Sequence, residues 1–148
     1  MAKFLFKMDS LLRLRDSIEE QKKNEFGRAV AELERHREKL NELMLEKERV
    51  VGEFHEALKN RIDSKKSDRY NKYIRLLDKR IDDQHVVVEK CEIIEEECRL
   101  ELIEATKEKK KLEKLREKQF QLYLIEEKRE EQKITDELVS YQTFVKGI

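Results

Sequence analysis

The chain has 148 residues, of which 46% are charged, 7% are aromatic and none is proline. Its 34 basic and 34 acidic residues leave no formal net charge, which excludes a general electrostatic attraction to nucleic acid or to an anionic membrane. With three glycines, few turns are expected, and the abundance of Glu, Lys, Arg and Leu is typical of long helices and coiled coils.

A first long helix is predicted from about residue 9 to residue 62. Apolar residues recur there every three or four positions, which is the narrow seam of a coiled coil and not the broad face of a globular helix. Arg37 and Lys47 interrupt the seam, and we expect them to weaken it locally. The predicted seam places Phe26, Leu33, Leu40 and Phe54 at one heptad position, and Val30, Met44, Val51 and Leu58 at the complementary one.

The seam lapses at about residues 63–68, which is the one break that the sequence predicts. Ser64 and Ser67 are suitable N-cap residues, and Asp68 would place a carboxylate favourably in the first turn of a following helix. A short break between two long helices usually produces an antiparallel pair. The expected fold is therefore all-α, a long antiparallel two-helix coiled-coil hairpin that forms a single domain over residues 1–148.

A second helix is predicted from about residue 68 to residue 143. Its apolar residues repeat with the same coiled-coil spacing as those of the first helix, so the two seams are expected to face each other. The second seam comprises Tyr70, Ile74, Leu77, Ile81, Val88, Cys91, Ile94, Cys98, Leu102, Ala105 and Leu112.

The second helix is expected to be the longer one and to overhang at the terminal end of the hairpin. A turn near Lys65 would place residue 9 opposite about residue 121, leaving about 20 residues, or about 30 Å of helix, without a partner. A lone helix with apolar side chains is poorly suited to water, so the overhang is predicted to bind another protein. The N-terminal Phe4, Leu5, Phe6 and Met8 are expected to cover part of it. Its apolar residues are Leu122, Tyr123, Leu124, Ile125, Ile134, Leu138, Val139, Tyr141, Phe144 and Val145.

No motif for catalysis or cofactor binding is present. The sequence has no glycine-rich phosphate loop, no HExxH, no CxxC and no nucleophile elbow. A two-helix hairpin also has no pocket that excludes water. We therefore expect no enzymatic activity, no cofactor, no metal and no small-molecule substrate. His36, His55 and His85 are expected to be solvated.

Cysteine spacing and hydropathy predict a cytosolic protein. Cys91 and Cys98 would lie about 10 Å apart along a helix, too far for a disulfide, and are expected to be small core residues. No stretch approaches about 18 consecutive apolar residues, and the start of the chain is too short and too charged for a secretory signal.

Two further segments leave alternatives open. The basic stretch from Lys107 to Lys118 contains interleaved glutamates and no aromatic residue, so a solvated face is favoured over nucleic-acid binding. Tyr70 and Tyr73, with Ile74 and Leu77, either cap the core near the turn or face a partner, and tyrosine suits such an interface.

Each end of the sequence carries a distinctive motif. The start, FLFKMDSLLRLRD, contains alternating phenylalanines and a Leu-Leu-x-Leu-Arg run. The segment EEKREEQKITDEL is an acidic–basic run that closes in Asp-Glu. Both motifs resemble signatures of the flagellar export protein FliJ family. The length and the aromatic residues after the break also fit, whereas the tail VSYQTFVKGI is more apolar than the family leads us to expect.

The resemblance implies a non-enzymatic, stalk-like component of the flagellar type III export apparatus, similar to the central stalk of rotary ATPases. It implies a cytoplasmic location, peripheral to the inner membrane at the flagellar base, and a monomer when free. The implied partners are the hexameric export ATPase, the cytoplasmic domain of the membrane export gate, and export chaperones. The residues expected to bind the ATPase are Phe4, Phe6, Leu11, Leu12, Arg13, Arg15, Glu126, Arg129, Glu130, Lys133, Asp136 and Glu137, and those expected to bind the gate are Tyr70, Tyr73, Ile74 and Leu77.

Three alternatives remain open from the sequence. The chain could be the equivalent stalk of a virulence secretion system or of a rotary ATPase. A generic coiled-coil tether would dimerise stably and have no ATPase partner. A helical-hairpin chaperone would hold unfolded clients with its overhang.

Overall fold

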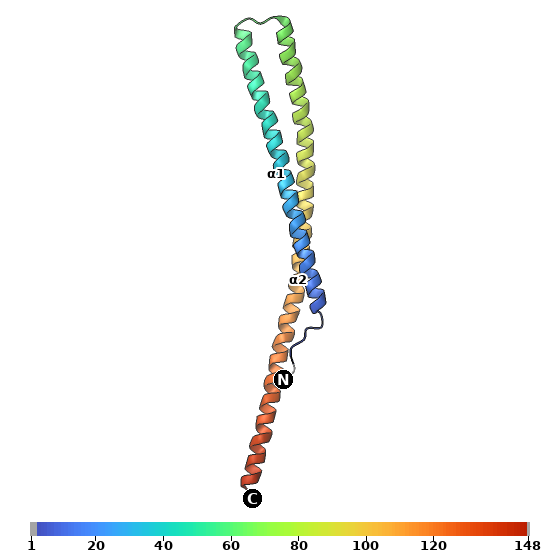
Figure 1. Cartoon of the computed structure of the whole chain (residues 1–148), viewed down its shortest axis with the longest axis vertical. Helices are drawn as coiled ribbons and strands as arrows, with labels where there is room; N and C mark the ends of the chain where they lie inside the picture. Colours follow the sequence, from blue (N-terminus) through green and yellow to red (C-terminus); the bar gives the residue numbers. More distant parts are fainter. Residues whose placement is uncertain (1–2, 148) are drawn as a thin grey trace. The chain divides into compact units, whose positions relative to one another are not determined.

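The computed structural model describes residues 3–147, so the terminal residues 1, 2 and 148 of the predicted domain lie outside it. Two helices are present, α1 (Asp9–Lys59) and α2 (Ser64–Lys146), and the described residues contain no strand. Figure 1 shows α1 and α2 joined by a short connection. The all-α hairpin with a longer second helix is thereby confirmed.

The packing divides the chain into two compact units. The hairpin unit is Gln21–Ile103, and the terminal unit combines Met1–Glu20 with Glu104–Ile148. Both helices continue without interruption from one unit into the other. A single domain over the whole chain stays a prediction.

Ion pairs between the helices of the hairpin unit follow an antiparallel order. Lys47 Nζ lies 2.5 Å from Asp78, Arg37 Nη2 lies 3.3 Å from Glu92, and Lys22 Nζ lies 3.0 Å from Glu101.

Toward the start of α1 each partner therefore lies farther along α2, as an antiparallel pair requires. These pairs are partly exposed, so they contribute little stability and mainly favour this alignment.

The connection is shorter than predicted. α1 ends at Lys59, and Arg61 has a φ of 51°, a left-handed conformation that cannot continue the helix. Asp63 accepts a 2.7 Å hydrogen bond from the backbone N–H of Lys66, so Asp63 is the N-cap of α2. The prediction of Ser64 or Ser67 as the N-cap was wrong. Because the cap lies earlier, α2 begins at Ser64 and not near residue 68.

The core of the hairpin unit confirms one half of the predicted α1 seam and corrects the other. Leu33 is 2% exposed, and Phe26, Leu40 and Phe54 are half-buried. Their partners in the seam are Ala29, Leu43 and Val50. Of the predicted partners, Val51 is half-buried, whereas Val30, Met44 and Leu58 are 42–48% exposed. Successive side chains are about 100° apart around the helix axis, so a shift of one position moves the seam to a neighbouring face.

The α2 seam is closer to prediction, with a polar exception. Leu77, Ile81 and Val88 are buried as expected, but Ile94 is 51% exposed. Gln84, 5% exposed, lies in the seam and donates a 2.9 Å hydrogen bond to the carbonyl of His36. Its amide nitrogen also lies 3.1 Å from His36 Nδ1. The His36 side chain is only 17% exposed, so its prediction as a solvated residue was wrong.

In the terminal unit, a charged cluster lies between the helices. Glu19 is 6% exposed, and Lys109 Nζ lies 3.3 Å from it and 2.7 Å from Asp16. The hydrogen bond to Asp16, with that to Glu19, raises the pKa of Lys109 above its ordinary value. Lys109 therefore keeps its charge and pairs with the buried carboxylate of Glu19.

Replacing Val50 by Ala tests the corrected seam. Val50 is 3% exposed, and loss of its methyl groups should lower the free energy of unfolding by about 2 kcal/mol. Val30, 42% exposed, provides the control, and Val30→Ala should change stability by less than about 0.5 kcal/mol. Urea unfolding followed by circular dichroism measures both. Equal losses would show that the seam does not run as described.

Candidate protein-binding surfaces

The N-terminal segment packs on α2 through an aromatic latch formed by Phe4, Phe120 and Tyr123. The ring of Phe4 lies 5.1 Å from that of Phe120 in an edge-to-face arrangement and 5.4 Å from that of Tyr123. Arg116 adds a cation–π contact, with its Cζ 5.6 Å from the centre of the Phe4 ring. Burial and a hydrogen bond to Glu127 raise the pKa of Tyr123. The residues that precede α1 are not helical, and they continue the packing on α2 beyond the point where α1 begins.

Two of the four N-terminal residues that were expected to cover part of the overhang do so. Phe6 is 8% exposed and Phe4 is half-buried, as expected for residues that cover part of the overhang. Leu5 is 82% exposed and Met8 43% exposed, so these two do not cover it.

The start of α1 adds two exposed members of the predicted ATPase-binding set. Leu11 is 38% exposed, and Arg13 is exposed and pairs with Asp9 at 3.2 Å. Leu12 and Arg15 are half-buried.

Beyond the latch, none of the described residues covers α2. Every residue from 128 to 147, here called the free segment, is exposed. At 1.5 Å per residue it is about 30 Å long. The six charged residues that were predicted to bind the ATPase on α2 all lie exposed in it or just before it. They are Glu126, Arg129, Glu130, Lys133, Asp136 and Glu137.

The apolar residues of the free segment are ordered. Ile134, Leu138, Tyr141 and Val145 follow at intervals of four, three and four residues, which places them on one side of the helix. Their exposed fractions run from 49% for Val145 to 66% for Tyr141. We call these four residues the terminal stripe. Its spacing is that of one strand of a coiled coil, so its geometry suits another helix.

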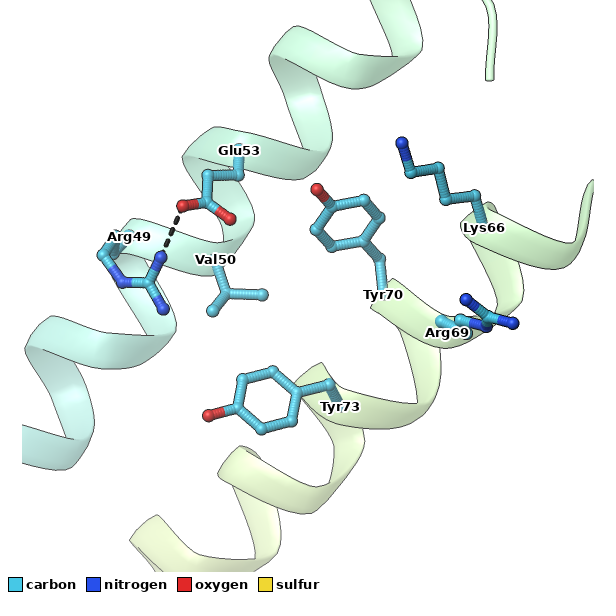
Figure 2. Close-up of a pocket in the computed structure, with 7 residues that line it drawn as sticks. All are labelled: Arg49, Val50, Glu53, Lys66, Arg69, Tyr70 and Tyr73. Atoms are coloured by element: carbon cyan, nitrogen blue, oxygen red, sulfur yellow. Dashed lines mark hydrogen bonds and ion pairs between the residues drawn. The ribbon is translucent and has the colours of Figure 1, made fainter. Parts of the chain in front are cut away.

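A shallow hollow lies next to the turn, in the hairpin unit (Figure 2). Its volume is about 320 Å³, and we call it the tip hollow. Arg49 pairs with Glu53 on its α1 side. Tyr73, 38% exposed, donates a 3.1 Å hydrogen bond to Glu46. The tip hollow is lined by Arg49, Val50, Glu53, Lys66, Arg69, Tyr70 and Tyr73.

The structure separates the four residues that were predicted to bind the gate. Tyr70 is half-buried, with its ring 5.1 Å from that of Phe54, and Ile74 is also half-buried. Leu77 is 1% exposed and belongs to the core. Its burial leaves no surface for direct contact with a partner, so Tyr73 is the most accessible of the four.

Charged residues of the tip hollow were missed in the sequence. Lys66 lies four residues before Tyr70 and seven before Tyr73, which places all three on one side of α2. That spacing was a usable signal. Arg49 and Glu53 come from α1, and only the pairing of the helices brings them to the same hollow.

Within residues 3–147, no helix is long and apolar enough to cross a membrane. The same range contains no group of three or more His, Cys, Asp or Glu side chains placed to hold a metal ion.

The fold and its surfaces define a two-helix coiled-coil hairpin whose accessible features are shallow faces. The family model described as flagellar FliJ protein matches residues 4–147, and the chain belongs to this family. It is 30% identical to the flagellar FliJ protein of Bacillus subtilis (strain 168) over 145 residues, which is 97% of this chain and 98% of the relative. No solved structure matches the chain significantly. The family predicted from the two terminal motifs is confirmed.

Replacing Phe4 by Ala tests the latch. Loss of its contacts with Phe120 and Tyr123 should lower the free energy of unfolding by about 1 kcal/mol. Hydrogen exchange should become faster at residues 3–8. Leu5→Ala, at an 82% exposed position, should leave both quantities unchanged. Faster exchange in the Leu5 variant and not in the Phe4 variant would contradict the latch.

Proposed function

We propose that this chain is a non-enzymatic stalk of the flagellar type III protein export apparatus. Its terminal unit binds the hexameric export ATPase, and the turn end of its hairpin unit binds the cytoplasmic domain of the membrane export gate. In this way it couples the ATPase to protein export. The observation that supports the proposal most is the free segment of α2, a stretch of helix in which every residue is exposed and the apolar residues are ordered on one side.

The terminal stripe provides the apolar contact for the ATPase end. Burying apolar side chains against a partner is favourable, because it removes their surface from water. Glu130 lies four residues before Ile134, and Glu137 lies four residues before Tyr141, so carboxylates flank one edge of the stripe. Such flanking charges steer docking and fix orientation more than they hold the complex together.

Tyr73 is the main contact proposed for the gate end. Its ring is partly exposed at a hollow that also presents Lys66 and Arg69. A tyrosine beside charged groups combines apolar area with hydrogen bonding, a common composition of interface centres.

For the remaining parts of the proposal, the support is membership of the family. Export chaperones are further partners, and the free protein is a monomer. It works in the cytoplasm, at the inner-membrane face of the flagellar base, without a nucleic-acid or small-molecule partner.

ATP hydrolysis by the purified export ATPase tests the terminal end. The intact chain should stimulate it, and removal of residues 132–148 should abolish the stimulation. This truncation keeps Phe120 and Tyr123, which hold the N-terminal segment, so the rest of the terminal unit stays folded.

A double replacement, Leu138→Gln with Tyr141→Gln, should raise the concentration for half-maximal stimulation about tenfold, equivalent to about 1.4 kcal/mol. Val139→Gln is the matched control, because Val139 is 55% exposed but lies off the terminal stripe, whereas Leu138 is 57% exposed and lies on it. Stimulation that survives the truncation would contradict ATPase binding by the free segment.

Tyr73→Ala tests the gate end. It should weaken binding to the purified cytoplasmic domain of the gate about tenfold, as for an interface residue worth somewhat more than 1 kcal/mol. Stimulation of the ATPase should not change. Lys72→Ala, at the neighbouring exposed position, is the control.

Leu77 is left out of this test, because its replacement would open a cavity in the core and cost about 2–5 kcal/mol. Equal loss of gate binding and ATPase stimulation on Tyr73→Ala would show that the two ends do not act separately.

A further inference from the structure

A second row of exposed apolar residues lies on α2 in the hairpin unit. Val86, Ile93 and Leu100 follow one another at intervals of seven residues. Their exposed fractions are 49%, 59% and 53%. We call these three residues the outer row.

The outer row faces away from α1. Val86 lies two residues after Gln84 and two before Val88, both of which are buried in the seam. Two residues correspond to about 200° of helix rotation, so Val86 lies on the opposite side of α2. The seven-residue repeat keeps Ile93 and Leu100 on that side. These residues therefore contribute nothing to the pairing of α1 with α2.

Acidic residues border the outer row. Asp82 and Asp83 lie four and three residues before Val86, Glu89 lies three after it, and Glu97 lies four after Ile93. All four are exposed, and none has an ion pair within the described part of the chain. Among the positions three or four residues away from a member of the outer row, Lys90 is the one basic residue. The border is thus strongly acidic, although the whole chain carries no formal net charge.

We propose that the outer row is a docking surface for a basic amphipathic helix of another protein. Val86, Ile93 and Leu100 would bury the apolar side of that helix, and the four carboxylates would pair with lysines or arginines at its margins. The row spans 14 residues, or about 21 Å, which corresponds to about four turns of the bound helix. This surface shares no residue with the tip hollow or with the terminal stripe.

The charges argue against two other occupants. A second copy paired through the same surface would bring like-charged borders together, because a two-fold interface presents the same patch on both sides. An anionic membrane would be repelled by the same carboxylates. A basic helix satisfies both the apolar row and its border.

The test uses two designed, fluorescein-labelled helical peptides with the same leucine stripe and the same length. One has lysines beside the stripe and the other has glutamates. Fluorescence anisotropy with the full chain should show binding of the lysine peptide, at least tenfold tighter than that of the glutamate peptide. The binding should weaken as salt is raised, since the charge pairs lie at a solvated margin.

Variants assign the binding to the outer row. Val86→Gln, Ile93→Gln and Leu100→Gln together should weaken binding of the lysine peptide at least tenfold, with unchanged helicity, thermal midpoint and ATPase stimulation. Leu45→Gln is the matched control, because Leu45 is a 55% exposed apolar residue on α1. Replacing Glu89 and Glu97 by Lys should shift the preference toward the glutamate peptide.

Three results would overturn the proposal. Both peptides could bind equally well, which would exclude recognition by charge. The triple variant could bind as tightly as the unchanged chain, which would place the peptide elsewhere. Sedimentation could show a dimer of the unchanged chain that the triple variant loses, which would make a second copy the occupant.

Discussion

The pairing of α1 with α2 along one narrow seam is the interaction on which the other features depend. Isolated helices gain little stability in water, and most helical stability in proteins comes from packing an apolar side. Here α1 has 51 residues and α2 has 83, so the seam cannot cover all of α2. The alignment of the two helices decides where cover ends and therefore which residues are exposed for other contacts.

Polar groups inside the seam favour one alignment of α1 with α2 over others. A seam of leucines and valines alone tolerates a shift by one heptad, because equivalent residues then meet again. Gln84 bonds to the carbonyl of His36, and Lys109 pairs with Asp16 and Glu19. Both contacts would be lost in a shifted pairing, and the buried amide of Gln84 would lose the carbonyl that accepts its hydrogen bond, which is costly. Polar residues at a and d positions are known to specify register at some cost in stability, and these contacts suit that role.

Much of the fold could be predicted from the sequence, because the patterns involved are local. The absence of proline, the seven-residue repeats and the lapse near residue 63 are sufficient for two helices and a turn. The α1 seam was harder, since Leu33 has an apolar neighbour at Val30 and a small one at Ala29. Local hydrophobicity favoured Val30, whereas packing against α2 buries Ala29.

For the same reason His36 and Gln84 were not expected in the core, because each is buried only through the other helix. The candidate sites also divide into features that the local sequence predicts and features that depend on the pairing of the helices. The free segment followed from helix lengths alone, whereas the burial of Leu77 and the contribution of Arg49 to the tip hollow depend on helix pairing.

Spacing, more than the amount of exposed apolar surface, separates the proposed binding faces from incidental exposure in this chain. A coiled coil of two helices leaves many apolar side chains partly in water, and single ones such as Leu45 need no explanation. The terminal stripe and the outer row differ because their members recur on one side of α2 over three or four turns. Such a side matches the periodicity of a partner helix, so successive residues can contact it together, whereas a scattered residue offers one contact. Selection for solubility alone would favour polar residues at these positions, because none of them supports the seam. Their order is what the proposed partner helices would require.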